Sequence, residues 1–139
     1  MEYSLYWGLE KAELPLIVVT CINNAGKTQN LCFLIDTGST NNILFDFVYR
    51  HFSEKFQKLD SQGFVIGFEG KEHQTLEVEV SFDFEGANYS SKFSVLDTFA
   101  GMRQIQEESG IQIHGVLGLP FLVEYEWTLD FKNLMVRND

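Results

Sequence analysis

The amino-acid sequence predicts a mostly β protein, a small closed or partly closed barrel with one or two short helices. In residues 74–84, apolar and polar side chains alternate, as in a strand with one buried and one solvated face. Residues 17–22 and 30–35 are apolar and rich in β-branched or aromatic residues, and the polar stretch between them predicts a hairpin. Of the 139 residues, 45% are hydrophobic and thirteen are phenylalanine, enough for one packed core. We therefore expect a single domain over residues 1–139.

The other elements are predicted from local patterns along the chain. Residues 45–56 carry aromatic and aliphatic side chains at helical spacing, which predicts an amphipathic helix with this stripe in the core. Residues 61–63 are expected to be a turn, and the polar segment 97–110 fits either a helical turn or a loop. We expect further strands at 64–68, 89–96, 111–117, 126–131 and 134–136, turns at 69–71 and 85–88, and a short helix at 119–123 begun at Pro120.

Two cysteines, Cys21 and Cys32, flank the first polar turn. A hairpin centred between Gly26 and Lys27 would place them opposite each other and make a disulfide conceivable. Two buried free thiols are the alternative that we favour. The histidines at 51, 73 and 114 lack the spacing of metal ligands, so no metal or other cofactor is expected.

The charge balance excludes some partners. Twenty acidic and ten basic residues give a net charge of −10, which repels nucleic acid and anionic membrane surfaces. No apolar stretch reaches the roughly 20 residues that a membrane-spanning helix needs. The first residues lack the basic region of a signal peptide. We expect a cytoplasmic protein, or one from which a leader was removed.

The segment F-L-I-D-T-G-S at 33–39 is the strongest indication of function. An apolar strand delivers one carboxylate, Asp36, into a tight turn at Thr37 and Gly38. Because carboxylates are rarely buried without partners, an acid that leaves the core in a glycine turn indicates chemistry. Gly38 permits close backbone approach, and Thr37 and Ser39 place hydroxyls beside the acid. By chance alone, Asp-Thr-Gly also occurs where an aspartate merely opens a turn.

Two later motifs, H-G-V-L-G-L at 114–119 and W-T-L-D-F at 127–131, change the interpretation of this tripeptide. Together with F-L-I-D-T-G-S, they resemble the retropepsin-like aspartic proteases, over residues 14–131. Leu119 and Pro120, and the added K-N-L-M-V-R-N-D, look closer to cellular and bacterial members than to retroviral ones. The resemblance implies the acid protease fold, a small closed β-barrel.

The resemblance also implies roles for individual residues. Asp36 would be the catalytic residue, with Thr37 bonding across a dimer interface and Ser39 donating to the outer carboxylate oxygen. The substrate-binding flap would lie at 65–70 and include Gly67, Phe68 and Gly70, although an ordinary hairpin is an equal alternative. The residues expected to pack beneath the active turn are Val116, Leu117 and Gly118.

Hydrolysis of a peptide bond without a metal needs both a base and an acid, which two carboxylates sharing one proton provide. The chain has one Asp-Thr-Gly, because Asp97-Thr98-Phe99 lacks the glycine. We therefore expect a homodimeric aspartic endopeptidase with an Asp36 dyad, active on peptide or protein substrates at mildly acidic pH. The alternative is a catalytically silent protease-like domain that binds extended peptides or mediates assembly. A generic barrel with a chance Asp-Thr-Gly ranks last.

Overall fold

A computed structural model shows that β-strands make up most of the chain and describes residues 1–22, 26–52, 56–66, 70–98 and 100–138. The strands are β1 (Glu2–Ser4), β2 (Leu16–Ile22), β3 (Thr28–Ile35), β4 (Ile43–Phe45), β5 (Gln57–Ile66), β6 (Glu72–Phe84), β7 (Ala87–Leu96), β8 (Gly115–Leu117), β9 (Thr128–Asp130) and β10 (Met135–Arg137). The helices are α1 (Tyr6–Ala12), α2 (Asp46–His51), α3 (Ala100–Ser109) and α4 (Leu119–Glu124). The predicted mostly β class is confirmed, with four short helices in the described residues rather than one or two.

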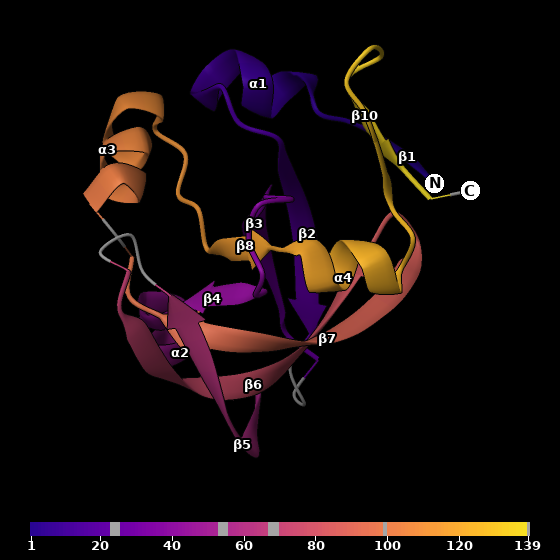
Figure 1. Cartoon of the computed structure of the whole chain (residues 1–139). Helices are drawn as coiled ribbons and strands as arrows, with labels where there is room; N and C mark the ends of the chain where they lie inside the picture. Colours follow the sequence, from indigo (N-terminus) through magenta and orange to yellow (C-terminus); the bar gives the residue numbers. More distant parts are fainter. Residues whose placement is uncertain (23–25, 53–55, 67–69, 99, 139) are drawn as a thin grey trace.

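Six strands close into a barrel in the order β2-β3-β8-β4-β7-β6, because β6 also pairs with β2 through Thr20 and Asp83. Strand β5 pairs with β6 but lies outside this closed circuit, as an edge strand (Figure 1). A second sheet has the order β1-β10-β9 and carries both ends of the chain, which lie side by side in Figure 1. The terminal strands of this chain are therefore paired with each other.

The first hairpin forms as predicted, but its register separates the two cysteines. Cys21 lies opposite Gln29 and Cys32 opposite Val18, because the hairpin turns earlier than the assumed centre. Neither cysteine forms a disulfide and both are buried, so the disulfide alternative is wrong. Burial raises the pKa of the Cys32 thiol to about 12.

Phenylalanine rings fill the barrel, as the composition predicted. The ring of Phe33 packs against Phe82 and Phe93 with centroids 5.7 and 5.6 Å apart. Phe82 in turn meets Phe121 of α4 at 5.6 Å, which joins the helix to the sheet. All four side chains are buried, so the site described below rests on a rigid aromatic core.

The predicted helix at 45–56 is wrong at both ends. Phe45 belongs to β4, which pairs with β7 and β8, and this pairing holds its backbone extended. The helix begins at Asp46, whose carboxylate pairs with Arg50 one turn later, and it ends at His51. Phe56 lies outside the helix but is buried, so the aromatic stripe does face the core.

Other boundaries differ where tertiary pairing overrides local signals. The expected turn at 61–63 lies within β5, where a register shift between Lys58 and Gln62 absorbs the irregularity. The strand expected at 111–117 is confined to β8, and the polar segment 97–110 contains α3. Parts of the predicted elements at 64–68 and 69–71 lie outside the described residues. No helix in the described ranges is long and apolar enough to cross a membrane.

Candidate active site

Strand β3 carries Asp36 to the end of the barrel. Ile35 is paired with Leu117 of β8, and its N–H donates to the carbonyl of Pro15 at 2.9 Å. The N–H of Asp36 donates to the carbonyl of Leu117 at 3.0 Å. Hydrogen bonds to Pro15 and Leu117 thus fix the backbone up to the carboxylate, which is exposed on this chain.

Backbone hydrogen bonds organise the turn after Asp36. The N–H of Gly38 donates to Oδ1 of Asp36 at 2.9 Å, and the N–H of Ser39 donates to the carbonyl of Asp36 at 3.2 Å. The hydroxyl of Ser39 donates to the carbonyl of Asn41 at 2.7 Å instead of to the Asp36 carboxylate. Thr37 is exposed. The turn therefore orients the carboxylate through a main-chain donor.

Strand β8 and the start of α4 lie directly beneath this turn. Val116 sits between Leu34 and Ile43 in the sheet. A side chain at Gly118 would put its Cβ 2.2 Å from the carbonyl oxygen of Asn41, so only glycine fits. The N–H of Leu119 then donates to the carbonyl of Ser39 at 2.9 Å. The structure thus brings the Asp-Thr-Gly-Ser and Val-Leu-Gly motifs together.

Asn42 is a structural residue of the site that sequence reasoning missed. Its Oδ1 accepts the N–H of Gly118 at 3.0 Å, and its Nδ2 donates to Ser91 Oγ at 3.2 Å and to the carbonyl of Lys92 at 3.1 Å. The side chain is buried, and it links the turn to β7 and to the start of α4. An asparagine after a polar turn resembles a loop residue, so the sequence carried no distinct signal for this role.

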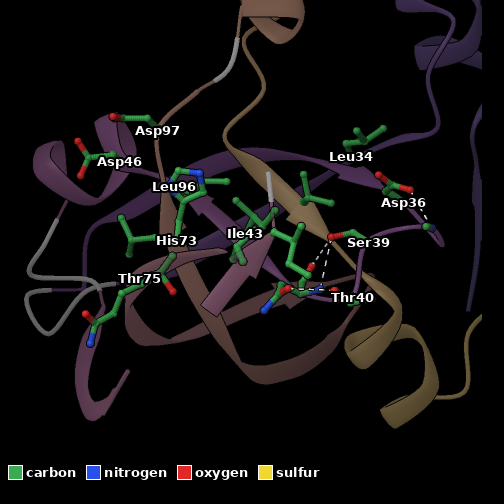
Figure 2. Close-up of a pocket in the computed structure, with 17 residues that line it drawn as sticks. Leu34, Asp36, Ser39, Thr40, Ile43, Asp46, His73, Thr75, Leu96 and Asp97 are labelled. Atoms are coloured by element: carbon green, nitrogen blue, oxygen red, sulfur yellow. Dashed lines mark hydrogen bonds between the residues drawn. The ribbon is translucent and has the colours of Figure 1, made fainter. Parts of the chain in front are cut away.

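A cleft of about 750 Å³ opens beside Asp36. Strands β3, β4, β5, β7 and β8 contribute the apolar side chains of its wall, namely Leu34, Ile43, Val65, Ile66, Val95, Leu96 and Val116. Figure 2 shows Asp36 and Ser39 at one end of this cleft and Asp46, Asp97 and His73 at the other. The cleft therefore has a largely apolar wall and carboxylates at both ends.

The β5–β6 hairpin borders the cleft where the flap was expected. Nδ2 of Asn41 donates to the carbonyl of Phe64 at 3.4 Å, which ties β5 to the active turn. Gly70 adopts a positive φ of 79° near the end of the hairpin and has open space around it. Gly67 and Phe68 lie outside the described residues.

His114 has a structural contact. Its Nδ1 accepts the N–H of Cys32 at 2.8 Å, and burial lowers the pKa of the imidazole from its ordinary value. Nδ1 can accept this bond only when it carries no proton, so it is the neutral form of His114 that holds β3. Within the described ranges, no three His, Cys, Asp or Glu side chains gather in a way that could hold a metal ion.

Comparison with known proteins bears on the fold. No protein-family model matches this sequence, and no curated protein is significantly similar to it. The crystal structure of the retroviral protease-like domain of Ddi1 from Leishmania major is similar, with a TM-score of 0.50 and 14% sequence identity. The match covers 87% of this chain and 88% of that chain. At this identity the likeness shows the fold alone, and the fold is retropepsin-like.

Proposed function

We propose that the chain is one half of a homodimeric aspartic endopeptidase, in which Asp36 of two copies forms the catalytic dyad. The observation that carries this proposal is the exposed Asp36 carboxylate, held by the Gly38 N–H at the end of a largely apolar cleft. Asp46 and Asp97 line the opposite end of the cleft (Figure 2), so neither supplies the second carboxylate. A two-fold axis beside Asp36 would supply it without any further sequence.

In such a dyad one carboxylate is ionised and the other is protonated, because two like charges a few ångströms apart cannot both ionise. The ionised Asp36 takes a proton from water, whose oxygen attacks the peptide carbonyl carbon. The protonated Asp36 of the partner gives its proton to the carbonyl oxygen. When the tetrahedral intermediate collapses, its hydroxyl returns that proton to the partner's Asp36 and the C–N bond breaks. The first Asp36 gives the proton that it took from water to the leaving amine.

The cleft is suited to an extended peptide. Its apolar wall would bury the side chains on one face of the peptide, and β5 borders it with main-chain groups that can pair with another strand. The fixed Gly38 N–H would keep one oxygen of Asp36 from rotating away from the water.

A second candidate function is peptide binding without turnover. The edge strand β5 carries two exposed apolar side chains, Phe64 at 55% and Ile66 at 72% exposure, on its path beside the cleft. Such an edge can add a peptide strand whether or not a dyad assembles. The two functions differ in whether peptide bonds are cut.

The test is digestion of a mixed peptide library from about pH 4 to pH 8, with molecular mass measured by light scattering. Wild type should cut as a dimer, best at mildly acidic pH, and Asp36→Asn should lower kcat/KM at least about 100-fold while it keeps the dimer mass. Asp60→Asn makes the same chemical change at an exposed position of β5 outside the cleft and should leave activity unchanged. Cleavage that survives Asp36→Asn would overturn the proposal, and peptide binding without cleavage would favour the second function.

A further inference from the structure

A second cavity, of about 670 Å³, adjoins the cleft and plays no part in the chemistry proposed above. Thr40 and Asn41, which follow the active turn, line both spaces. Strands β5, β6 and β7 and helix α4 form the other walls. A peptide in the cleft could therefore direct a side chain past Thr40 and Asn41 into this cavity.

Three polar side chains converge on the side of β5 where Gly63 has no side chain. A Cβ at Gly63 would lie 2.8 Å from Thr75 Oγ1, 3.0 Å from the carboxyl carbon of Glu77 and 3.0 Å from Ser94 Oγ. Thr75, Glu77 and Ser94 are only 5%, 4% and 2% exposed. The convergence interrupts the apolar alternation that β6 follows farther along the strand. These three side chains thus pack directly against Gly63, where any larger residue would collide with them. Glu77 and Ser94 also line the cavity, whereas Thr75 lines the cleft.

Thr75 and Glu77 have unused hydrogen-bonding capacity. Thr75 Oγ1 is buried and has no hydrogen-bond partner. The carboxylate of Glu77 has Lys92 Nζ 3.4 Å from its Oε2, longer than the roughly 2.7–2.9 Å of a close charge-assisted hydrogen bond. The Lys92 side chain is 59% exposed, so it approaches from the solvent side. A buried acid and an unpaired hydroxyl reduce the stability of the free chain unless a ligand or water satisfies them.

We propose that this cavity is a specificity subsite for a basic side chain of the substrate, arginine in particular. Glu77 would supply the counter-charge, and the hydroxyl of Ser94, which lines the same cavity, would accept a further N–H bond. The guanidinium group has five donors in a fixed plane, which suits several acceptors around one point. Glu79 and Glu124 also line the cavity, so its acidic side chains outnumber Lys92, the cation in its lining, and favour a further positive charge.

This inference rests on the proposed function, because it names the substrate class of the same cleft. The cavity meets the cleft at Thr40 and Asn41 rather than at Asp36. The basic residue would accordingly lie some positions away from the bond that is cut, on one side of it.

The test uses matched peptides built on a sequence that the library digestion identifies. Each position within about four residues of the cut carries arginine in one peptide and citrulline, its uncharged isostere, in the other. Wild type should prefer arginine at one position by roughly 10- to 100-fold in kcat/KM, the range expected for a hydrogen-bonded charge. Glu77→Gln should bring the ratio close to one, because it removes the counter-charge that only the arginine peptide uses.

The control is Glu107→Gln, which removes one negative charge from the exposed face of α3 and should keep the preference for arginine. Gly63→Ala would place a methyl group 3.0 Å from the Glu77 carboxyl carbon and from Ser94 Oγ, so both side chains would have to move. This variant should also remove the preference, without changing any charge. The subsite would be overturned if wild type cut arginine and citrulline peptides equally, or if the preference survived Glu77→Gln. Either result would mean that water, and not a substrate side chain, fills the cavity.

Binding to Asp36→Asn separates this inference from the proposed function. Fluorescence anisotropy with the most favourable arginine peptide and its citrulline partner measures the preference without turnover. If wild type cuts nothing in the library, an apolar host peptide is used in place of that pair, with arginine or citrulline placed at each position in turn. A tenfold preference for arginine that Glu77→Gln removes would support the subsite even where catalysis fails. Equal affinities would overturn it even where catalysis succeeds.

Discussion

At the scale of single residues, Asn42 connects more of the site than any residue of the Asp-Thr-Gly turn. Its buried amide bonds to the N–H of Gly118 and to β7 at Ser91 and Lys92. Its own carbonyl accepts the N–H of Ser94 at 2.8 Å. One side chain therefore sets the spacing between the active turn, the helix start and a barrel strand.

We predict that Asn42→Ala lowers the free energy of unfolding by about 1–3 kcal/mol, because it leaves the buried N–H of Gly118 without a partner. Urea denaturation measures the change. Asn88→Ala is the matched control: Asn88 is exposed and bonds to Asp83, so the loss there should stay within about 0.5 kcal/mol. Equal losses at both positions would show that the buried hydrogen bonds of Asn42 stabilise the fold no more than the exposed one of Asn88.

The residues near Asp36 also show how far the sequence can predict a site. The Asp-Thr-Gly-Ser motif located the turn, since glycine and short polar residues specify a turn locally. It did not reveal where the Ser39 hydroxyl is directed, because the acceptor is a backbone carbonyl whose position depends on Asn41. Nor did it predict Asn42, whose partners lie 49 or more positions away in the chain.

At the scale of elements, α4 has an apolar face that this chain leaves uncovered. Leu119 and Val123 are 44% and 65% exposed, whereas Phe121 and Leu122 are buried. The N–H of Leu119 is bonded to the carbonyl of Ser39, so the helix begins at the active turn. In the proposed dimer, the partner would cover this face of α4, because the helix begins beside the Asp36 turn that the two copies must share.

Val123→Glu should therefore shift the light-scattering mass toward the monomer and lower cleavage in proportion, because a charge in an apolar interface must be desolvated. Ile22→Glu is the control, because Ile22 is also exposed, at 52%. It lies at the end of β2 that is far from Asp36, since Pro15, just before the other end, bonds to Ile35. A dimer that persists in Val123→Glu would place the interface elsewhere.

Elements with a clear local period were predicted well, and the others were not. The long strand β6 and the first hairpin follow from alternation and from β-branched runs. The segment 45–56 has helical spacing, yet Phe45 is extended because β7 and β8 pair with β4. The stretch that holds α1 has no marked period, and no helix was predicted there.

At the scale of the whole molecule, stability should depend on pH through His114. Burial lowers the pKa of this imidazole in the folded state, while the unfolded chain keeps the ordinary value of about 6.5. Above that value both states are neutral and no stability is lost. As the pH falls below it, the unfolded chain binds a proton that the folded chain does not, so folding becomes less favourable.

We predict that the free energy of unfolding of wild type falls between about pH 7 and pH 5, and that His114→Asn reduces the fall. Asparagine can still accept the N–H of Cys32 but cannot be protonated in this range. Urea denaturation at both pH values gives the difference. His51→Asn removes an exposed histidine and should leave the wild-type slope unchanged. An equal slope in His114→Asn would exclude His114 as the cause.

The sequence by itself determined the mostly β class, the apolar barrel strands and the turn that carries Asp36, because alternation, β-branched runs and glycine turns act between near neighbours in the chain. Only the tertiary structure decided the register that separates Cys21 from Cys32 and the convergence of Thr75, Glu77 and Ser94 at Gly63. These arrangements depend on hydrogen bonds and packing between segments far apart in the chain. Each such contact is selected by the free energy of the whole barrel and not by the residues beside it.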